Sequence, residues 1–171
     1  MAAAETPRSI LVGVTHGQAE VVLRHAARFA KVYHAGLICA HVDPGRYVVD
    51  QRPDGTITSL PLDPDLPELR ESDFDPELAA HVRRVVGDDS IPISFRELAG
   101  DAAYALARIA DILDVELIVV GSRRGGVRAG MRQFLNGSVA AHLAHRQPRP
   151  VVVVPVAPVV EGRAMPWEDE Q

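Results

Sequence analysis

The stretch Gly100–Arg123, GDAAYALARIADILDVELIVVGSR, places a helix, a buried strand and a glycine turn in direct succession. Gly100 and Asp101 form a typical helix start. Apolar residues then recur at three- and four-residue steps and predict a helix over 102–113, with a stripe made of Ala105, Leu106, Ile109 and Leu113. Leu117–Val120 is wholly apolar, which is typical of a strand buried on both faces. The unit predicts an α/β fold.

The same alternation extends outward in both directions. The pattern predicts strands at Ser9–Val14, Leu37–Val42, Ile91–Leu98, Leu117–Val120 and Val151–Val154, and helices at Ala19–His34, Pro76–Val86, Ala102–Leu113 and Asn136–His145. Gly36 is expected to end the first helix, and Asp75 is expected to cap the second, with Pro76 at its first helical position. Pro92 places its strand near a sheet edge, because proline cannot donate to the ladder. Strands that alternate with amphipathic helices predict a parallel sheet with helices on both faces.

One stretch interrupts this regularity. Residues 44–75 are acidic and rich in proline, and we expect a long loop insertion with one small hairpin around Asp54-Gly55. The remaining organisation is a flexible N-terminus over 1–8, one α/β domain over 9–156, and a polar C-terminal tail over 157–171. Such an insertion is either a family-specific addition or a partner-binding element.

Composition narrows the class of protein. The chain has 171 residues and a net charge of −5, and its start carries no apolar leader segment. Its longest uncharged apolar run, Pro150–Val160, is shorter than the ~20 residues that span a bilayer, so we expect a cytoplasmic protein without a membrane segment. The acidic balance and the eight aromatic residues disfavour nucleic-acid binding. Cys39, the single cysteine, lies in an apolar run and is expected to be buried and inert.

Charge is distributed unevenly along the chain. Residues 43–77 hold ten acidic side chains, whereas residues 117–160 hold six arginines and no acid. The basic part contains GSRRGGVRAGMRQFLNGSVA, residues 121–140. A helix that begins at Asn136-Gly137-Ser138 would present free backbone N–H groups to an anion, and the glycines before it would let the loop fold over a phosphate. The alternative is a structural turn in which Asn136 only caps the helix.

Several segments resemble the universal stress protein family. They are SILVGV, ICAHVDP, GDAAYALARIADILDVELIVVGSR and NGSVAAHLAHRQPRPVVVVP, which occur in the family's order and spacing over about 110 residues. The resemblance implies an open five-stranded parallel sheet in the order 3-2-1-4-5, a homodimer, and in one branch an ATP site with the pattern G-x2-G-x9-G-[ST]. In that order the loops after the first and fourth strands are neighbours, where open α/β sheets bind ligands.

The ATP pattern is matched in part. The resemblance assigns the phosphate end to Gly121, Gly137, Ser138 and Val139. Arg124 occupies the second glycine position, Gly125 follows one residue late, and the spacing to Gly137 is longer than in the family.

The base end also departs from the family. Val14 and Val42 match its contacts to adenine, but Thr15 stands where ATP-binding members commonly have an acid. Arg123, Arg124 and Arg128 match no motif position and are either phosphate-pairing guanidiniums or solvated arginines. The expected ligand is ATP or another adenine nucleotide, with Mg²⁺ as a possible companion, bound as a stress-response regulatory ligand.

Other readings of the sequence stay open. A dimeric interaction module of the same fold that binds no nucleotide is the first alternative, and a slow ATP hydrolase without an evident general base is the second. The apolar edge Val151–Val154 is expected either to pair with a second copy or to be buried under a helix. His142 and His145 share a helix face but lack a third metal ligand nearby, and His16 lies close to the proposed site.

Overall fold

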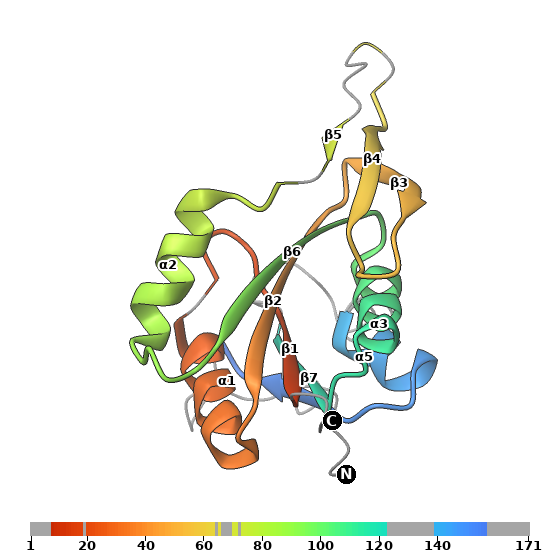
Figure 1. Ribbon diagram of the computed structural model, residues 1–171. Coiled ribbons are helices and arrows are strands. Elements are labelled where there is room, and N and C mark those ends of the chain that lie inside the picture. Colours follow the sequence, from red (N-terminus) through yellow and green to blue (C-terminus); the bar gives the residue numbers. More distant parts are fainter. Residues whose placement is uncertain are drawn as a thin grey trace, which may run out of the picture.

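The computed structural model describes residues 8–18, 20–63, 65, 70–71, 73–122 and 139–156. A central sheet carries helices on both sides, and a separate small sheet projects from one end of it (Figure 1). The gaps between these ranges do not interrupt any strand of the central sheet. The fold can therefore be followed strand by strand.

The central sheet has five parallel strands in the order β6-β2-β1-β7-β8. They are β1 (Ser9–Gly13), β2 (Gly36–Asp43), β6 (Ile93–Ala99), β7 (Leu117–Gly121) and β8 (Val151–Val154). Numbered within this sheet alone, the order is 3-2-1-4-5, which confirms the predicted α/β fold. The register is continuous across the centre, where Leu11 lies opposite Ile38 on one side and Ile118 on the other.

Helices cover the two faces in pairs (Figure 1). One face carries α1 (Glu20–Tyr33) and α2 (Pro76–Val86), and the other carries α3 (Ala102–Ile112) and α5 (Val139–Arg146). Side chains of β1 alternate between them: Ile10 and Val12 pack below α1, whereas Leu11 packs below α3. All three are fully buried, and each contributes about 1.5–3 kcal/mol to folding through burial. No helix in the described ranges has the length and apolar character needed to cross a bilayer.

Two helix starts follow the sequence prediction. Asp75 caps α2 by accepting a hydrogen bond from the backbone N–H of Glu77 at 2.7 Å, and Pro76 follows at the first helical position. Asp101 caps α3 by accepting from the backbone N–H of Tyr104 at 2.8 Å. Both caps satisfy N–H groups that would otherwise lack a partner inside the helix.

Gly36 does not end α1, and that prediction is wrong. The helix stops at Tyr33, and His34 takes the left-handed backbone conformation with φ of 50°. Gly36 is instead the first residue of β2, where an added Cβ would come within 3.1 Å of the carbonyl oxygen of Pro92. The glycine is needed there because the neighbouring chain approaches its backbone closely.

Residues 44–75 contain an antiparallel sheet of three strands. The strands are β3 (Arg46–Gln51), β4 (Ile57–Pro61) and β5 (Arg70–Glu71). The predicted hairpin around Asp54-Gly55 is confirmed as the β3–β4 turn, where Gly55 has φ of 85° and is buried against Ile109 of α3. A further anchor is Arg46, whose guanidinium donates to the hydroxyl and to the carbonyl of buried Ser59 at 2.8 and 2.7 Å.

Candidate functional site

The carboxyl ends of β1 and β7 lie side by side, as the predicted strand order requires. Val12 lies opposite Val119, and each strand ends within two residues of that pair. The helix after β1, α1, lies on one face, whereas α5, the next described helix after β7, lies on the other face. This is the switch point at which open α/β sheets bind their ligands.

The loop after β1 is a compact turn. The backbone N–H of Val14 donates to the carbonyl of Ala40 at 2.8 Å, and the Gln18 side chain donates to the carbonyl of Gly13 at 3.1 Å. The Thr15 carbonyl accepts from the N–H of Gln18 at 3.2 Å, while its side chain is exposed at the sheet edge. Thr15 is therefore available to a ligand through its hydroxyl.

Gly121 stands at the end of β7 among three close neighbours. An added Cβ would lie 3.1 Å from Val22, 3.1 Å from Val156 and 3.4 Å from the Gln18 amide nitrogen. Ser122 follows and is fixed to β8, because its N–H donates to the carbonyl of Val154 at 2.8 Å. Packing within the fold thus accounts for a glycine at position 121, whether or not a ligand approaches it.

Val14 and Val42 do not form two sides of one slot. Val14 is buried in the cluster below α1, whereas Val42 is half-buried in the cluster below α3. Val139, at the start of α5, packs against the same cluster as Val42. The structure therefore brings Val42 and Val139 to the α3 face and leaves Val14 able to contact a ligand only through its backbone.

The other predicted phosphate contacts lie outside the described residues. They are Arg123, Arg124, Gly125, Gly137 and Ser138. Two arginines of the basic stretch lie in the described residues: Arg146 is exposed at the end of α5, and Arg149 pairs with Asp114 at 2.9 Å and with Asp111 at 3.4 Å. The Arg149 Nε also donates to the carbonyl of Val115 at 2.9 Å. The charge of Arg149 is thus used within the fold rather than offered to an anion.

Two histidine–carboxylate pairs meet beside the loop after β1, and sequence reasoning missed them. His16 Nε2 lies 2.6 Å from Asp75, and His41 Nδ1 lies 2.7 Å from Glu97. The two imidazole rings contact each other edge to face, with centroids 5.6 Å apart. His41 and Glu97 lie opposite each other in the parallel pair β2–β6. A predicted register of these two strands would therefore have revealed this pair.

These pairs shift the titration of two groups. The hydrogen bond that the His41 ring donates to the Glu97 carboxylate raises the pKa of His41 above its ordinary value, against the opposing effect of burial. The hydrogen bond from His16 lowers the pKa of Asp75, and the bond from the Glu77 N–H lowers it further. The contacts therefore favour the protonated form of His41 and the ionised form of Asp75.

Cys39, His142 and His145 are the other titratable residues that the sequence analysis considered. Cys39 is buried, as predicted, and burial raises the pKa of its thiol to about 12. Within the described residues, no three His, Cys, Asp or Glu side chains are grouped to hold a metal ion. His142 and His145 lie on α5 without a third ligand in that part of the chain.

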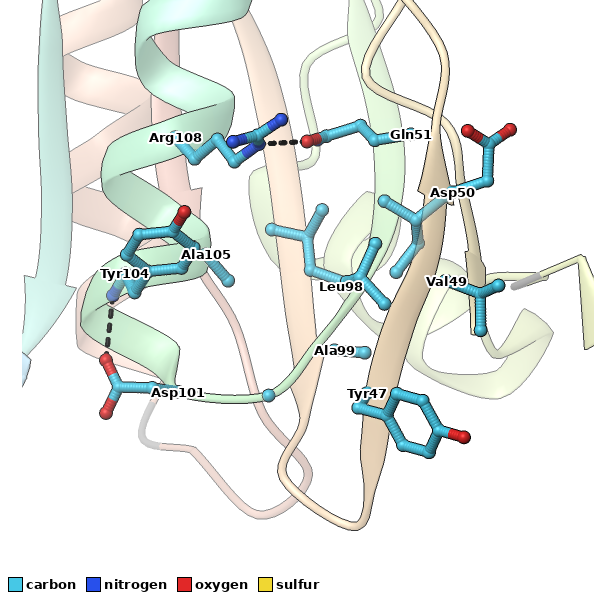
Figure 2. A pocket seen from close by; sticks show the side chains of 13 residues that line it. Tyr47, Val49, Asp50, Gln51, Leu98, Ala99, Asp101, Tyr104, Ala105 and Arg108 are labelled. Carbon is cyan, nitrogen blue, oxygen red and sulfur yellow. Dashed lines mark hydrogen bonds between the residues drawn. The ribbon is translucent and has the colours of Figure 1, made fainter. Parts of the chain in front are cut away.

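A hollow lies apart from the β1–β7 edge. Figure 2 shows it between β3 and α3, with the end of β6 at its base. Its volume is about 530 Å³. No local sequence pattern indicates this hollow, because its two walls come from segments more than fifty residues apart.

Comparisons with known proteins agree with this architecture. The model of the family described as the universal stress protein family matches residues 7–155. No curated protein matches the sequence. The solved structure of a universal stress protein from Archaeoglobus fulgidus is 21% identical, with a TM-score of 0.57, over 86% of this chain and 98% of that one.

Two similar solved structures carry a nucleotide. A universal stress protein in complex with cAMP is 22% identical, with a TM-score of 0.58, over 90% of this chain and 100% of that one. A universal stress protein from Archaeoglobus fulgidus in complex with dAMP is 19% identical, with a TM-score of 0.55, over 87% and 98% of the two chains. At these identities the likeness establishes the fold.

Proposed function

This chain belongs to the universal stress protein family, and from that premise we propose that it binds an adenine nucleotide, ATP in the first instance, as a regulatory ligand. The site is the edge where β1 and β7 end. The observation that supports it is the switch point itself, with exposed Thr15 on one side and Val42 and Val139 on the α3 face. Similar structures that hold cAMP and dAMP support the ligand class.

Each predicted contact has a stated part in the proposal. Gly137, Ser138 and the start of α5 at Val139 receive the phosphates, with Arg123 and Arg124 as charged partners. Gly121 and Gly125 let the loop turn over the phosphates. Val42 and the backbone of Val14 contact the base, and Mg²⁺ accompanies the triphosphate. The protein acts in the cytoplasm as part of a stress response.

The test is equilibrium titration calorimetry of ATP into nucleotide-stripped protein. We expect Gly137→Glu to abolish binding, because a carboxylate side chain would occupy the phosphate position. Ser138→Ala should weaken binding about threefold to tenfold, as expected for the loss of one hydrogen bond. The matched control is Ser94→Ala, at an exposed position of β6. Undetectable heat with ATP, AMP and cAMP would reject the proposal in favour of an interaction module without nucleotide.

Slow hydrolysis of the bound nucleotide is the second candidate, and one observation favours it. His16 lies in the loop after β1 and is hydrogen-bonded to Asp75, which is the pairing that orients a general base. Phosphate release at saturating ATP should then fall at least tenfold in His16→Gln protein that still binds ATP. Equal release from the two proteins would exclude His16 as the base.

The proposal includes a homodimer that forms through β8. This strand is one end of the sheet, and its side chain at Val153 is 46% exposed. An apolar strand with an unpaired edge invites pairing with an identical strand.

A further inference from the structure

The hollow between β3 and α3 has the dimensions of a small-molecule site. Its volume of about 530 Å³ lies within the range of roughly 300–1,000 Å³ that ligand pockets occupy. Its lining comes from β3, β4, the end of β6 and the first two turns of α3. The proposed nucleotide contacts at Thr15, Val42 and Gly121 do not line it.

The base and sides of this hollow are apolar or aromatic. Leu98 and Ala99 are buried at its base, and Tyr47 and Tyr104 stand on opposite walls (Figure 2). The described part of the chain exposes eight large apolar side chains, and four of them line this one hollow: Tyr47, Val48, Val49 and Tyr104. Exposed apolar surface gathered around a cavity marks a binding site, and tyrosine faces favour a flat ring.

Arg108 supplies a fixed positive charge at one end. Its side chain crosses from α3 to β3, where Nε donates to the side-chain oxygen of Gln51 (Figure 2). This bond uses one N–H and leaves the two terminal amino groups, whose spacing matches a carboxylate. In the described part of the chain, no carboxylate is paired with Arg108.

Two acids limit the charge that a ligand can carry. Asp50 and Asp101 also line the hollow, so its formal charge is negative despite Arg108. A phosphate or a dicarboxylate would place a second negative charge near these acids, whereas a single carboxylate can be neutralised by the one arginine. A neutral aromatic ligand would leave the Arg108 guanidinium without a carboxylate partner.

We propose that this hollow binds a small aromatic monocarboxylate of about two rings. The rings lie on Leu98 and Ala99 between Tyr47 and Tyr104, and the carboxylate accepts two hydrogen bonds from the terminal amino groups of Arg108. This site is distinct from the nucleotide site, and it stands whether or not the chain binds ATP.

The first experiment is an NMR titration of the ¹⁵N-labelled full chain with 2-naphthoate. We expect amide shifts to concentrate at residues 47–51 and 98–108. The neutral isostere 2-naphthamide should bind at least tenfold more weakly, because it cannot form the charged pair with Arg108. Cyclohexanecarboxylate should also bind more weakly, because it lacks the flat faces that pack on tyrosine. Saturating ATP should leave the 2-naphthoate affinity unchanged.

Variants separate the two interactions. Arg108→Gln should reduce 2-naphthoate affinity at least tenfold and leave 2-naphthamide affinity unchanged. Tyr104→Leu, at a side chain that is 57% exposed, should weaken both probes without unfolding the protein. Arg28→Gln on α1 is the matched control, since it removes an exposed helical arginine far from the hollow in sequence and on the other face.

Three outcomes would contradict the proposed ligand site. Equal affinity for 2-naphthoate and 2-naphthamide, or an Arg108→Gln protein that binds 2-naphthoate as well as the Arg28→Gln control, would reject the carboxylate site. Displacement of 2-naphthoate by ATP would show that the probe occupies the nucleotide site instead. Absence of shifts at millimolar 2-naphthoate would reject the aromatic ligand altogether.

Discussion

At the scale of single residues, the contact between His41 and Glu97 couples protonation to stability. Both side chains are largely buried, with 19% and 12% of their surfaces exposed, and a 2.7 Å hydrogen bond joins them. Folding raises the pKa of His41 above its ordinary value of 6.5 because Glu97 stabilises the imidazolium. The folded chain therefore retains this proton at pH values where the unfolded chain loses it.

The stabilisation has a defined pH window. It is complete below pH 6.5 and disappears as the pH rises through the folded pKa of His41. In Glu97→Gln protein we expect that pKa to fall, and the stability loss above pH 6.5 to become smaller. NMR titration of the His41 ring and urea unfolding between pH 5 and 8 measure the two effects. Asp89→Asn, an exposed acid, is the control, and an unchanged His41 pKa in Glu97→Gln would contradict the mechanism.

Cys39 gives a second prediction at this scale. Iodoacetamide reacts with the thiolate form of cysteine. Two effects slow this reaction at Cys39, because the side chain is fully buried and its pKa is raised to about 12. We expect negligible alkylation of the folded protein at pH 8 and rapid alkylation in denaturant, both followed by mass spectrometry. Modification of native protein at the rate of free cysteine would show that β2 opens readily.

Which of these residues the sequence could reveal depends on the range of their contacts. Asp75 and Asp101 were predicted as caps because a cap is recognised from the next three residues. His16 and His41 were not paired with their acids, because 59 and 56 positions separate the partners. The phosphate contacts at Gly137 and Ser138 stay predictions.

At the scale of elements, the β3–β4 hairpin depends on its turn glycine. Gly55 has φ of 85°, and an added Cβ would collide with the side chain of Ile109. Gly55→Ala should therefore destabilise the protein by about 2–4 kcal/mol, since it combines left-handed backbone strain with overpacking. Urea denaturation of the two proteins measures the difference.

Gly17→Ala separates the effect of backbone strain from the effect of overpacking. Gly17 has φ of 68° but no atom within 4 Å of an added Cβ, so its substitution should cost only about 1 kcal/mol. Equal losses from Gly55→Ala and Gly17→Ala would mean that the hairpin does not pack on α3 as described.

The predicted ends of helices agree with the structure where local patterns determine them. They disagree where a contact with a distant segment determines which residue is needed. α2 was predicted at its observed bounds, Pro76–Val86, because both its cap and its apolar stripe are local. The prediction that Gly36 ends α1 is wrong because its close neighbour is Pro92, which directly precedes β6 and lies far away in the sequence. The two walls of the hollow, β3 and α3, could not be paired from sequence for the same reason.

At the scale of the whole molecule, the strand order followed from the family resemblance, whereas the assembly remains to be measured. Val153→Lys would place a charge on the exposed β8 edge and should convert the proposed dimer into monomer, as seen by light scattering after size exclusion. Val49→Lys, at a hairpin position that is 53% exposed, should leave the mass unchanged. A dimer that survives Val153→Lys would place the interface elsewhere.

The position of the β3–β4 hairpin in the chain has a consequence for evolution. It lies entirely within the connection from β2 to β6, and those two strands keep an unbroken register from Leu37 opposite Ile93 to Asp43 opposite Ala99. A lineage can therefore lengthen, shorten or rewrite the hairpin without moving a strand of the central sheet. Each rewriting would reshape one wall of the hollow beside α3, so that new ligand preferences can arise by drift in a segment on which the common architecture makes no demand.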